Sequence, residues 1–140
     1  MEEYMKKPKM LLLFSHTLTG DQEEDANKSL NIREFVPLSD DLQNLWTHLP
    51  PTKSSLRDSL KPFHRWLKEN ANNSDFVLIQ GDFGAVYLMV NFAFSLGLIP
   101  VYATTERIVV EKRMQDNTVK SERIFKHRMF RRYEKEAYDE

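Results

Sequence analysis

Residues 76–98 constrain the fold more than any other part of this chain. A short apolar run, Phe76-Val77-Leu78-Ile79, leads into the turn Gln80-Gly81-Asp82-Phe83-Gly84 and then into a long apolar segment from Ala85 to Leu98. A continuous apolar run of this length is typical of a strand that is buried on both faces. The segment after the turn is long enough to form a buried helix. Together they indicate one unit of a parallel α/β sheet.

Strands and helices are predicted to alternate before and after this unit. We expect further strands at 9–14, 32–38 and 99–103, with Pro37 placing the second strand at a sheet edge. One helix is expected after the capping box of Thr19 and Gln22, and another after Ser39. A third, from Leu56 to Leu67, should kink or break at Pro62. The predicted fold class is α/β: a Rossmann-like, mostly parallel sheet flanked by helices.

The last third of the chain follows a different pattern. Arg107 to Met114 and Val119 to Lys126 are separated by the polar residues 115–118, which predicts a β-hairpin. Phe130 to Ala137 is predicted to form a short terminal helix.

Bulk properties limit the function classes. The 140 residues suit one domain, 1–140, and a net charge of -1 gives no general attraction to DNA or to membranes. The chain has no cysteine, so thiolate catalysis and disulfides are excluded. The apolar run 10–14 is too short for a signal peptide or a membrane span, so a cytoplasmic protein is expected. No His and carboxylate pair has metal-ligand spacing, and we expect neither a metal nor another cofactor.

Polar side chains follow three of the predicted strands. Ser15-His16-Thr17 follows the first, Gln80 to Gly84 the third, and Thr104-Thr105-Glu106-Arg107 the fourth. Ligands of open α/β sheets bind at the carboxyl ends of the strands, so these segments predict a single site.

Each segment also has a purely structural interpretation. The glycine turn either cradles an anion with its N–H groups or is an ordinary βα turn; it matches neither a Walker motif nor a dinucleotide fingerprint. Asp82 either binds a ribose or adenine amino group or caps the next helix, and the cap is favoured. His16 is either a functional imidazole or a surface histidine. Thr104 to Arg107 either bind phosphate or form a turn with a surface ion pair.

A basic strip runs from Arg123 to Arg132, with aromatic residues between its cations. Such a strip fits a nucleotide or RNA phosphate, or else the solvated face of a strand. Its best candidates for ligand contact are Lys126, His127 and Arg131, because they are expected near the end of the strand.

Four motifs, in this order, resemble a known family. They are Ser15-His16-Thr17-Leu18-Thr19, the Gln80 to Ala85 turn, Tyr102 to Arg107, and Phe125-Lys126-His127 with Phe130, Arg131 and Tyr133. The pattern resembles the small Csx-type accessory proteins of type III CRISPR systems, in their twentieth-numbered branch. The resemblance implies a CARF-like fold, a homodimer, and a ring nuclease that binds and cleaves a cyclic oligoadenylate. The expected ring is the tetra-adenylate.

Under this hypothesis the ring carries its own nucleophile, the ribose 2′-hydroxyl, and the protein orients it. Arg107 and Arg131, assisted by Lys126, stabilise the phosphoryl charge, and His16 or His127 is the general acid or base. Ser15, Thr17, Thr104, Thr105 and the backbone of residues 80–84 hold phosphate and ribose.

Three other functions remain open on the sequence alone. The same pocket would serve a sensor or sponge that does not cut the ring. A Rossmann-like fold would also suit a mononucleotide or NAD-type enzyme. An adaptor that contacts linear RNA through the basic strip would bind any RNA in a salt-sensitive way.

Overall fold

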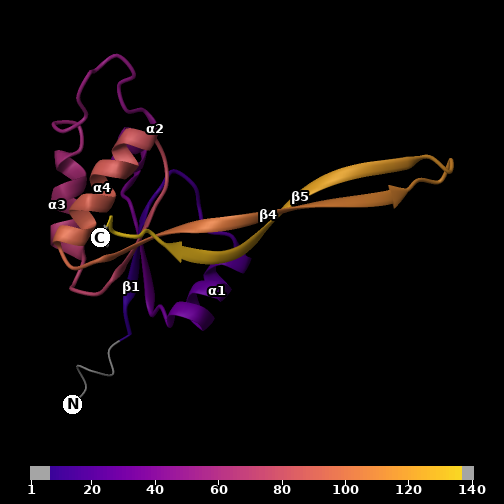
Figure 1. Cartoon of the computed structure of the whole chain (residues 1–140), viewed down its shortest axis with the longest axis horizontal. Helices are drawn as coiled ribbons and strands as arrows, with labels where there is room; N and C mark the ends of the chain where they lie inside the picture. Colours follow the sequence, from indigo (N-terminus) through magenta and orange to yellow (C-terminus); the bar gives the residue numbers. More distant parts are fainter. Residues whose placement is uncertain (1–6, 137–140) are drawn as a thin grey trace, which may run out of the picture.

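The computed structural model describes residues 7–136 as one five-stranded sheet with helices on both faces (Figure 1). In chain order its elements are β1 (Lys9–Leu13), α1 (Gly20–Leu30), β2 (Glu34–Pro37), α2 (Asp40–Thr47), α3 (Lys61–Asn70), β3 (Phe76–Ile79), α4 (Phe83–Ser95), β4 (Ile99–Arg113) and β5 (Val119–Arg132). The strand order is β2-β1-β3-β4-β5. The first four strands are parallel and β5 is antiparallel to β4. The predicted α/β class with a mostly parallel sheet is therefore confirmed.

The topology explains why helices cover both faces. From β1 the chain crosses to β2 on one side, whereas from β3 it crosses to β4 on the other side. Right-handed crossovers then place α1 and α4 on opposite faces of the sheet. Met10, Leu12 and Ala26 belong to the core on the α1 face, while Leu11, Leu13 and Met89 belong to the core on the face of α2, α3 and α4.

Local sequence signals account for most helix ends. Thr19 and Gln22 form the predicted capping box of α1, and Ser39 caps α2. Pro62 lies in the first turn of α3, so the helix begins there and the preceding residues are not part of it. Gly97, with φ 73°, follows α4 in the left-handed conformation, as expected for its C-terminal end.

The C-terminal third differs from the prediction at two points. β4 does not end at Ala103 but runs on to Arg113, and its ladder with β5 is continuous except for a bulge at Thr104/Thr105. The predicted helix 130–137 is wrong over all of its described residues, because Phe130 to Arg132 pair with β4 and residues 133–136 form neither helix nor strand; Ala137 lies outside the described residues. The hairpin itself is confirmed, with its turn at residues 115–118.

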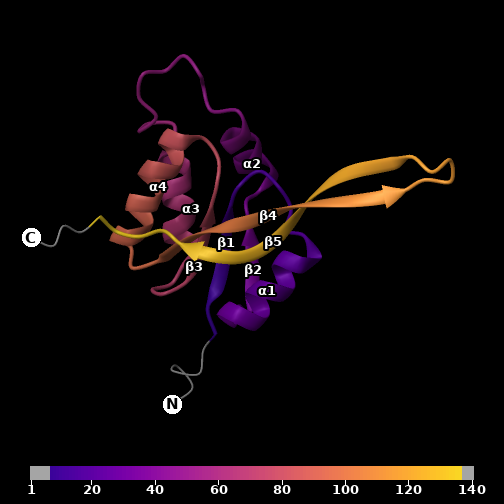
Figure 2. The same ribbon diagram turned by 45° about the vertical axis from the view of Figure 1, so that its right-hand side comes forward.

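Beyond the bulge, the hairpin leaves the body of the molecule (Figures 1 and 2). We call residues 106–126 the arm. Neither apolar core includes a residue of the arm. The arm nevertheless carries six of the nine large apolar side chains that are exposed within residues 7–136: Val109, Val110, Met114, Val119, Ile124 and Phe125. A two-stranded ribbon without a covering layer is marginally stable in isolation, so this surface is suited to contact another molecule.

Candidate functional site

The sheet has one topological switch point, between β1 and β3. The chain leaves these two neighbouring strands in opposite directions, and in open α/β sheets the ligand crevice lies at the carboxyl ends of such strands. The segments that follow them are Ser15-His16-Thr17 and Gln80 to Gly84, and we call these eight residues the switch-point crevice. Two of the three predicted polar segments are thus brought together.

Side chains of α2 tie both halves of the crevice to the body. Gln43 Nε2 donates a hydrogen bond of 3.0 Å to the Ser15 carbonyl, and Trp46 Nε1 donates one of 3.0 Å to the Gln80 carbonyl. Gln80 in turn accepts a 2.7 Å hydrogen bond from Ala103 N through its side-chain oxygen. The Gln80 side chain therefore joins β3 to β4, and its backbone is fixed by Trp46.

The glycine turn has the features of a packed βα turn. A Cβ on Gly81 would lie 2.8 Å from Trp46 Nε1, so only glycine allows the indole to approach the backbone this closely. Asp82 accepts a 3.0 Å hydrogen bond from Ala85 N and caps α4, which is the interpretation that the sequence favoured. Residues 81–84 are all exposed, so the turn is open to a ligand on its outer side.

The β1 half of the crevice adjoins a pocket of about 280 Å³. His16 and Thr17 are exposed at its rim, and Gln43 and Glu23 also line it. The other walls are apolar: Leu12, Phe14, Leu18, Phe35, Pro37 and Leu38. An apolar pocket with a few polar groups at its mouth is the usual form of a small-molecule site.

The third predicted segment is not a strand end. Thr104 and Thr105 lie within β4, where the Thr104 hydroxyl accepts from Met129 N and donates to Met129 O, both at 3.2 Å. The turn does not form at this point, because Ala103 pairs with Phe130, Thr104 with Met129 and Thr105 with His127, and the ladder continues past them.

Arg107 and Lys126 lie on the arm, apart from the crevice. Arg107 lies six residues after Val101, the last β4 residue paired with β3, a separation of about 20 Å along an extended strand. Its guanidinium stacks over Phe125, with 5.8 Å to the ring centroid. One chain alone therefore does not bring Arg107 to the crevice.

Arg131 lies at the base of the arm. Its guanidinium donates a 3.0 Å hydrogen bond to the Tyr102 hydroxyl and lies over the same ring. Tyr133 packs against Tyr102 and donates a 2.7 Å hydrogen bond to the Ile79 carbonyl at the end of β3. Burial raises the pKa of the Tyr133 hydroxyl, with a smaller contribution from Tyr102, so this group remains a neutral donor.

His127 faces α1 rather than the crevice. Its Nε2 lies 2.8 Å from Asp25 Oδ2, its side chain is 7% exposed, and Nδ1 is buried with no hydrogen-bond partner among residues 7–136. Burial alone would raise the pKa of Asp25, but hydrogen bonds from Ser29 and His127 hold it below its ordinary value. No sequence signal links Asp25 with His127, because they are 102 positions apart.

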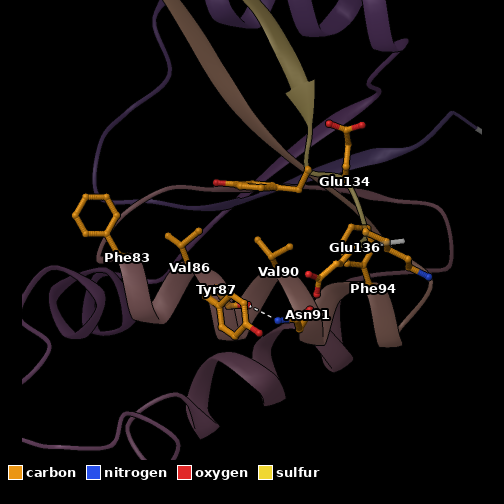
Figure 3. Close-up of a pocket in the computed structure, with 10 residues that line it drawn as sticks. Phe83, Val86, Tyr87, Val90, Asn91, Phe94, Glu134 and Glu136 are labelled. Atoms are coloured by element: carbon orange, nitrogen blue, oxygen red, sulfur yellow. Dashed lines mark hydrogen bonds between the residues drawn. The ribbon is translucent and has the colours of Figure 1, made fainter. Parts of the chain in front are cut away.

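A groove of about 560 Å³ lies between α4 and residues 133–136. Figure 3 shows Val86, Val90 and Phe94 in a row along the helix, with Phe83 at its first turn. Phe83 is 95% exposed and Tyr87 is 69% exposed. Sequence reasoning missed this groove, because an apolar helix such as α4 is normally buried on all sides.

A model named Uncharacterized protein MJ1673 family matches residues 8–131. The chain belongs to this family. A protein of Methanocaldococcus jannaschii described as "Uncharacterized protein MJ1673" is 49% identical over 126 residues, which cover 90% of this chain and 97% of that protein. No solved structure matches the chain. The MJ1673 family match includes the crevice and the whole arm.

Within 7–136 no group of three or more His, Asp or Glu side chains is arranged to hold a metal ion. None of the helices in that range is long and apolar enough to cross a bilayer.

Proposed function

We propose that this protein is a CARF-like ring nuclease of type III CRISPR signalling. It binds a cyclic oligoadenylate, with the tetra-adenylate as the expected ring, and cleaves it without a metal. The observation that carries this proposal is the strand order. It brings Ser15-His16-Thr17 and the exposed turn of residues 80–84 to the two sides of one switch point. Hydroxyls, an imidazole and exposed backbone at such a crevice suit the riboses and phosphates of a nucleotide ligand.

The chemistry follows from the ligand itself. A 2′-oxygen attacks the adjacent phosphorus, the bond from phosphorus to the 5′-oxygen breaks, and a 2′,3′-cyclic phosphate and a 5′-hydroxyl result. A base removes the 2′ proton and an acid supplies one to the 5′-oxygen. Holding the three reacting atoms in line can lower the barrier by roughly 7–11 kcal/mol in the best intramolecular cases.

Among the histidines, the geometry favours His16 as the acid or base. His16 is exposed at the crevice, whereas both nitrogens of His127 are enclosed between α1 and β5. His127 is better suited to hold the base of the arm against α1. Arg131 is the predicted cation nearest to the carboxyl ends of the strands, held in place by Tyr102.

A homodimer is part of the proposal. A two-fold axis would place two copies of the crevice around one ring and would let a short chain enclose it. The exposed apolar side chains of α4, Phe83 and Tyr87, and those of the arm provide surface for such contacts.

A second function is a sensor or sponge that binds the ring without cutting it. One observation favours it: the eight crevice residues include no Lys or Arg to stabilise a phosphoryl transition state. Binding and cleavage must therefore be measured separately.

The decisive experiment is a single-turnover assay with purified protein, EDTA and radiolabelled cyclic tetra-adenylate. We expect linear di-adenylate with cyclic phosphate ends. An intact ring together with a tight gel shift would make the protein a sensor. Neither cleavage nor binding would refute the proposed ligand.

A further inference from the structure

The crevice is acidic at its rim. The helices that follow β1, β2 and β3 all begin at the carboxyl edge of the sheet, and their caps and first turns carry five carboxylates: Asp21, Glu23, Asp40, Asp41 and Asp82. None of the five has a cation within 4.0 Å among the described residues. A phosphodiester ligand would therefore need cations from outside the crevice.

The arm, in contrast to the crevice rim, carries exposed positive charge. Its register places Arg107, Arg113 and Arg123 on one face, which also carries one carboxylate, Glu111, beside Val109, Val119, Ser121 and Phe125. No carboxylate of residues 7–136 forms an ion pair with these three arginines. We call this surface the arginine face. On the opposite face Lys120 is paired with Glu122.

The arm cannot bring this face to its own crevice. Arg107 is paired with Phe125 beyond the bulge at Thr104/Thr105, about 20 Å along the strand from the point where β4 leaves β3. Within one chain the unpaired arginines and the unpaired carboxylates therefore remain separate. In a two-fold dimer the same two surfaces can meet twice, once at each crevice.

We propose that the arm of one copy lies across the crevice of a second copy, with its arginine face toward the partner's carboxylates. Arg107 would then reach a bound phosphate in trans and complete a site that each chain holds only in part. The contact between arm and crevice rests on the charges described above. The phosphate role of Arg107 rests in addition on the proposed function.

The contact can be tested without any activity. Because the natural chain has no cysteine, Arg107→Cys and Thr17→Cys chains can be co-expressed with different tags, purified as mixed oligomers and treated with a short bismaleimide. We expect a covalent dimer. The matched control is Ile108→Cys, the next residue, which lies on the opposite face of the arm; it should cross-link far less. Equal cross-linking of both positions, or a monomer by light scattering, would overturn the proposal.

Complementation tests the phosphate role of Arg107. In a mixed dimer of His16→Ala and Arg107→Gln chains, one crevice regains both groups if the arm acts in trans, so about half of the wild-type cleavage should return. His16→Ala with Arg131→Gln is the control, since Arg131 belongs to its own chain's sheet and no crevice is restored. Cross-linking without complementation would retain the contact and refute the role of Arg107.

The two proposals fail in distinguishable ways. If the wild-type protein neither binds nor cleaves the ring but still cross-links through Arg107→Cys, the arm contact stands and the ligand is wrong. If the arginine face instead binds linear RNA, fluorescence anisotropy with a single-stranded oligonucleotide will show salt-sensitive binding that Arg107→Gln/Arg123→Gln weakens. Such binding by a monomeric protein would overturn the dimer contact.

Discussion

The Nε2 atom of His127 lies 2.8 Å from the Oδ2 atom of Asp25 and joins the base of the arm to α1. The two side chains are 7% and 22% exposed, so the bond is largely shielded from water. Asp25 also accepts a hydrogen bond of 2.6 Å from Ser29. This pair connects the C-terminal hairpin to α1, in the N-terminal part of the chain.

Replacing His127 with alanine should destabilise the fold. The change leaves a cavity beside Phe130 and removes one partner of Asp25, which together should cost about 1–3 kcal/mol in the free energy of unfolding. Urea unfolding measures the loss. Lys126→Ala, at the exposed neighbouring position, should be close to neutral. Unchanged stability with a large loss of ring cleavage would instead assign His127 to catalysis.

The Asp25 carboxylate should make the stability depend on acidity. Because its pKa in the folded state lies below the unfolded value, its contribution is present above the unfolded pKa and is lost as the pH falls through the folded pKa. The difference in unfolding free energy between the wild type and Asp25→Asn should therefore be larger at about pH 6 than at about pH 3. A difference that does not change between these two conditions would contradict this assignment.

Gly81→Ala should disturb the turn at the crevice. Its Cβ would meet the Trp46 indole at 2.8 Å, so either the turn or the indole must move, at a cost of about 1–3 kcal/mol. Gly20→Ala is the matched control, because no atom lies within 4 Å of its added Cβ. Equal stability of the two variants in urea would show that the turn adapts without strain.

His16→Ala should separate binding from chemistry. If His16 is the acid or base, the single-turnover rate of ring cleavage should fall by roughly 10²–10⁴-fold while the affinity for the ring changes little. His48 is also exposed, but it lies at the C-terminal end of α2, so His48→Ala should cleave at the wild-type rate. A similar rate for both variants would remove His16 from the mechanism.

Shortening the arm should leave the body folded. Replacing residues 108–124 with a two-residue Asn-Gly turn removes none of the side chains in the two apolar cores. We expect the thermal midpoint of the protein at low concentration to shift by only a few degrees. A loss of the cooperative transition would show that the body depends on the arm.

The sequence predicted those elements whose signals are local. The apolar run 76–79, the capping box at Thr19 and the glycine after α4 each specify their structure within a few residues, and all were confirmed. The extension of β4 was missed, because Thr104 and Thr105 suit both a turn and a strand. The pairing of Phe130 with Ala103 decides between them, and it joins residues that are far apart in the chain.

The candidate site was only partly predictable for the same reason. Parallel strands share a carboxyl edge, so the meeting of Ser15 to Thr17 with Gln80 to Gly84 followed from the predicted topology. Neither the distance of Arg107 from this edge nor the orientation of His127 toward α1 could be deduced. Both depend on where the antiparallel ladder leaves the sheet.

The hydrogen bond from Trp46 to the Gln80 carbonyl gives the protein a built-in optical probe. The indole touches the crevice turn from inside, whereas Trp66, the other tryptophan of the chain, lies in α3. In a Trp66→Phe background, the emission of Trp46 alone should report any molecule that moves the turn. Ligands for this protein can therefore be screened in solution without attaching a label.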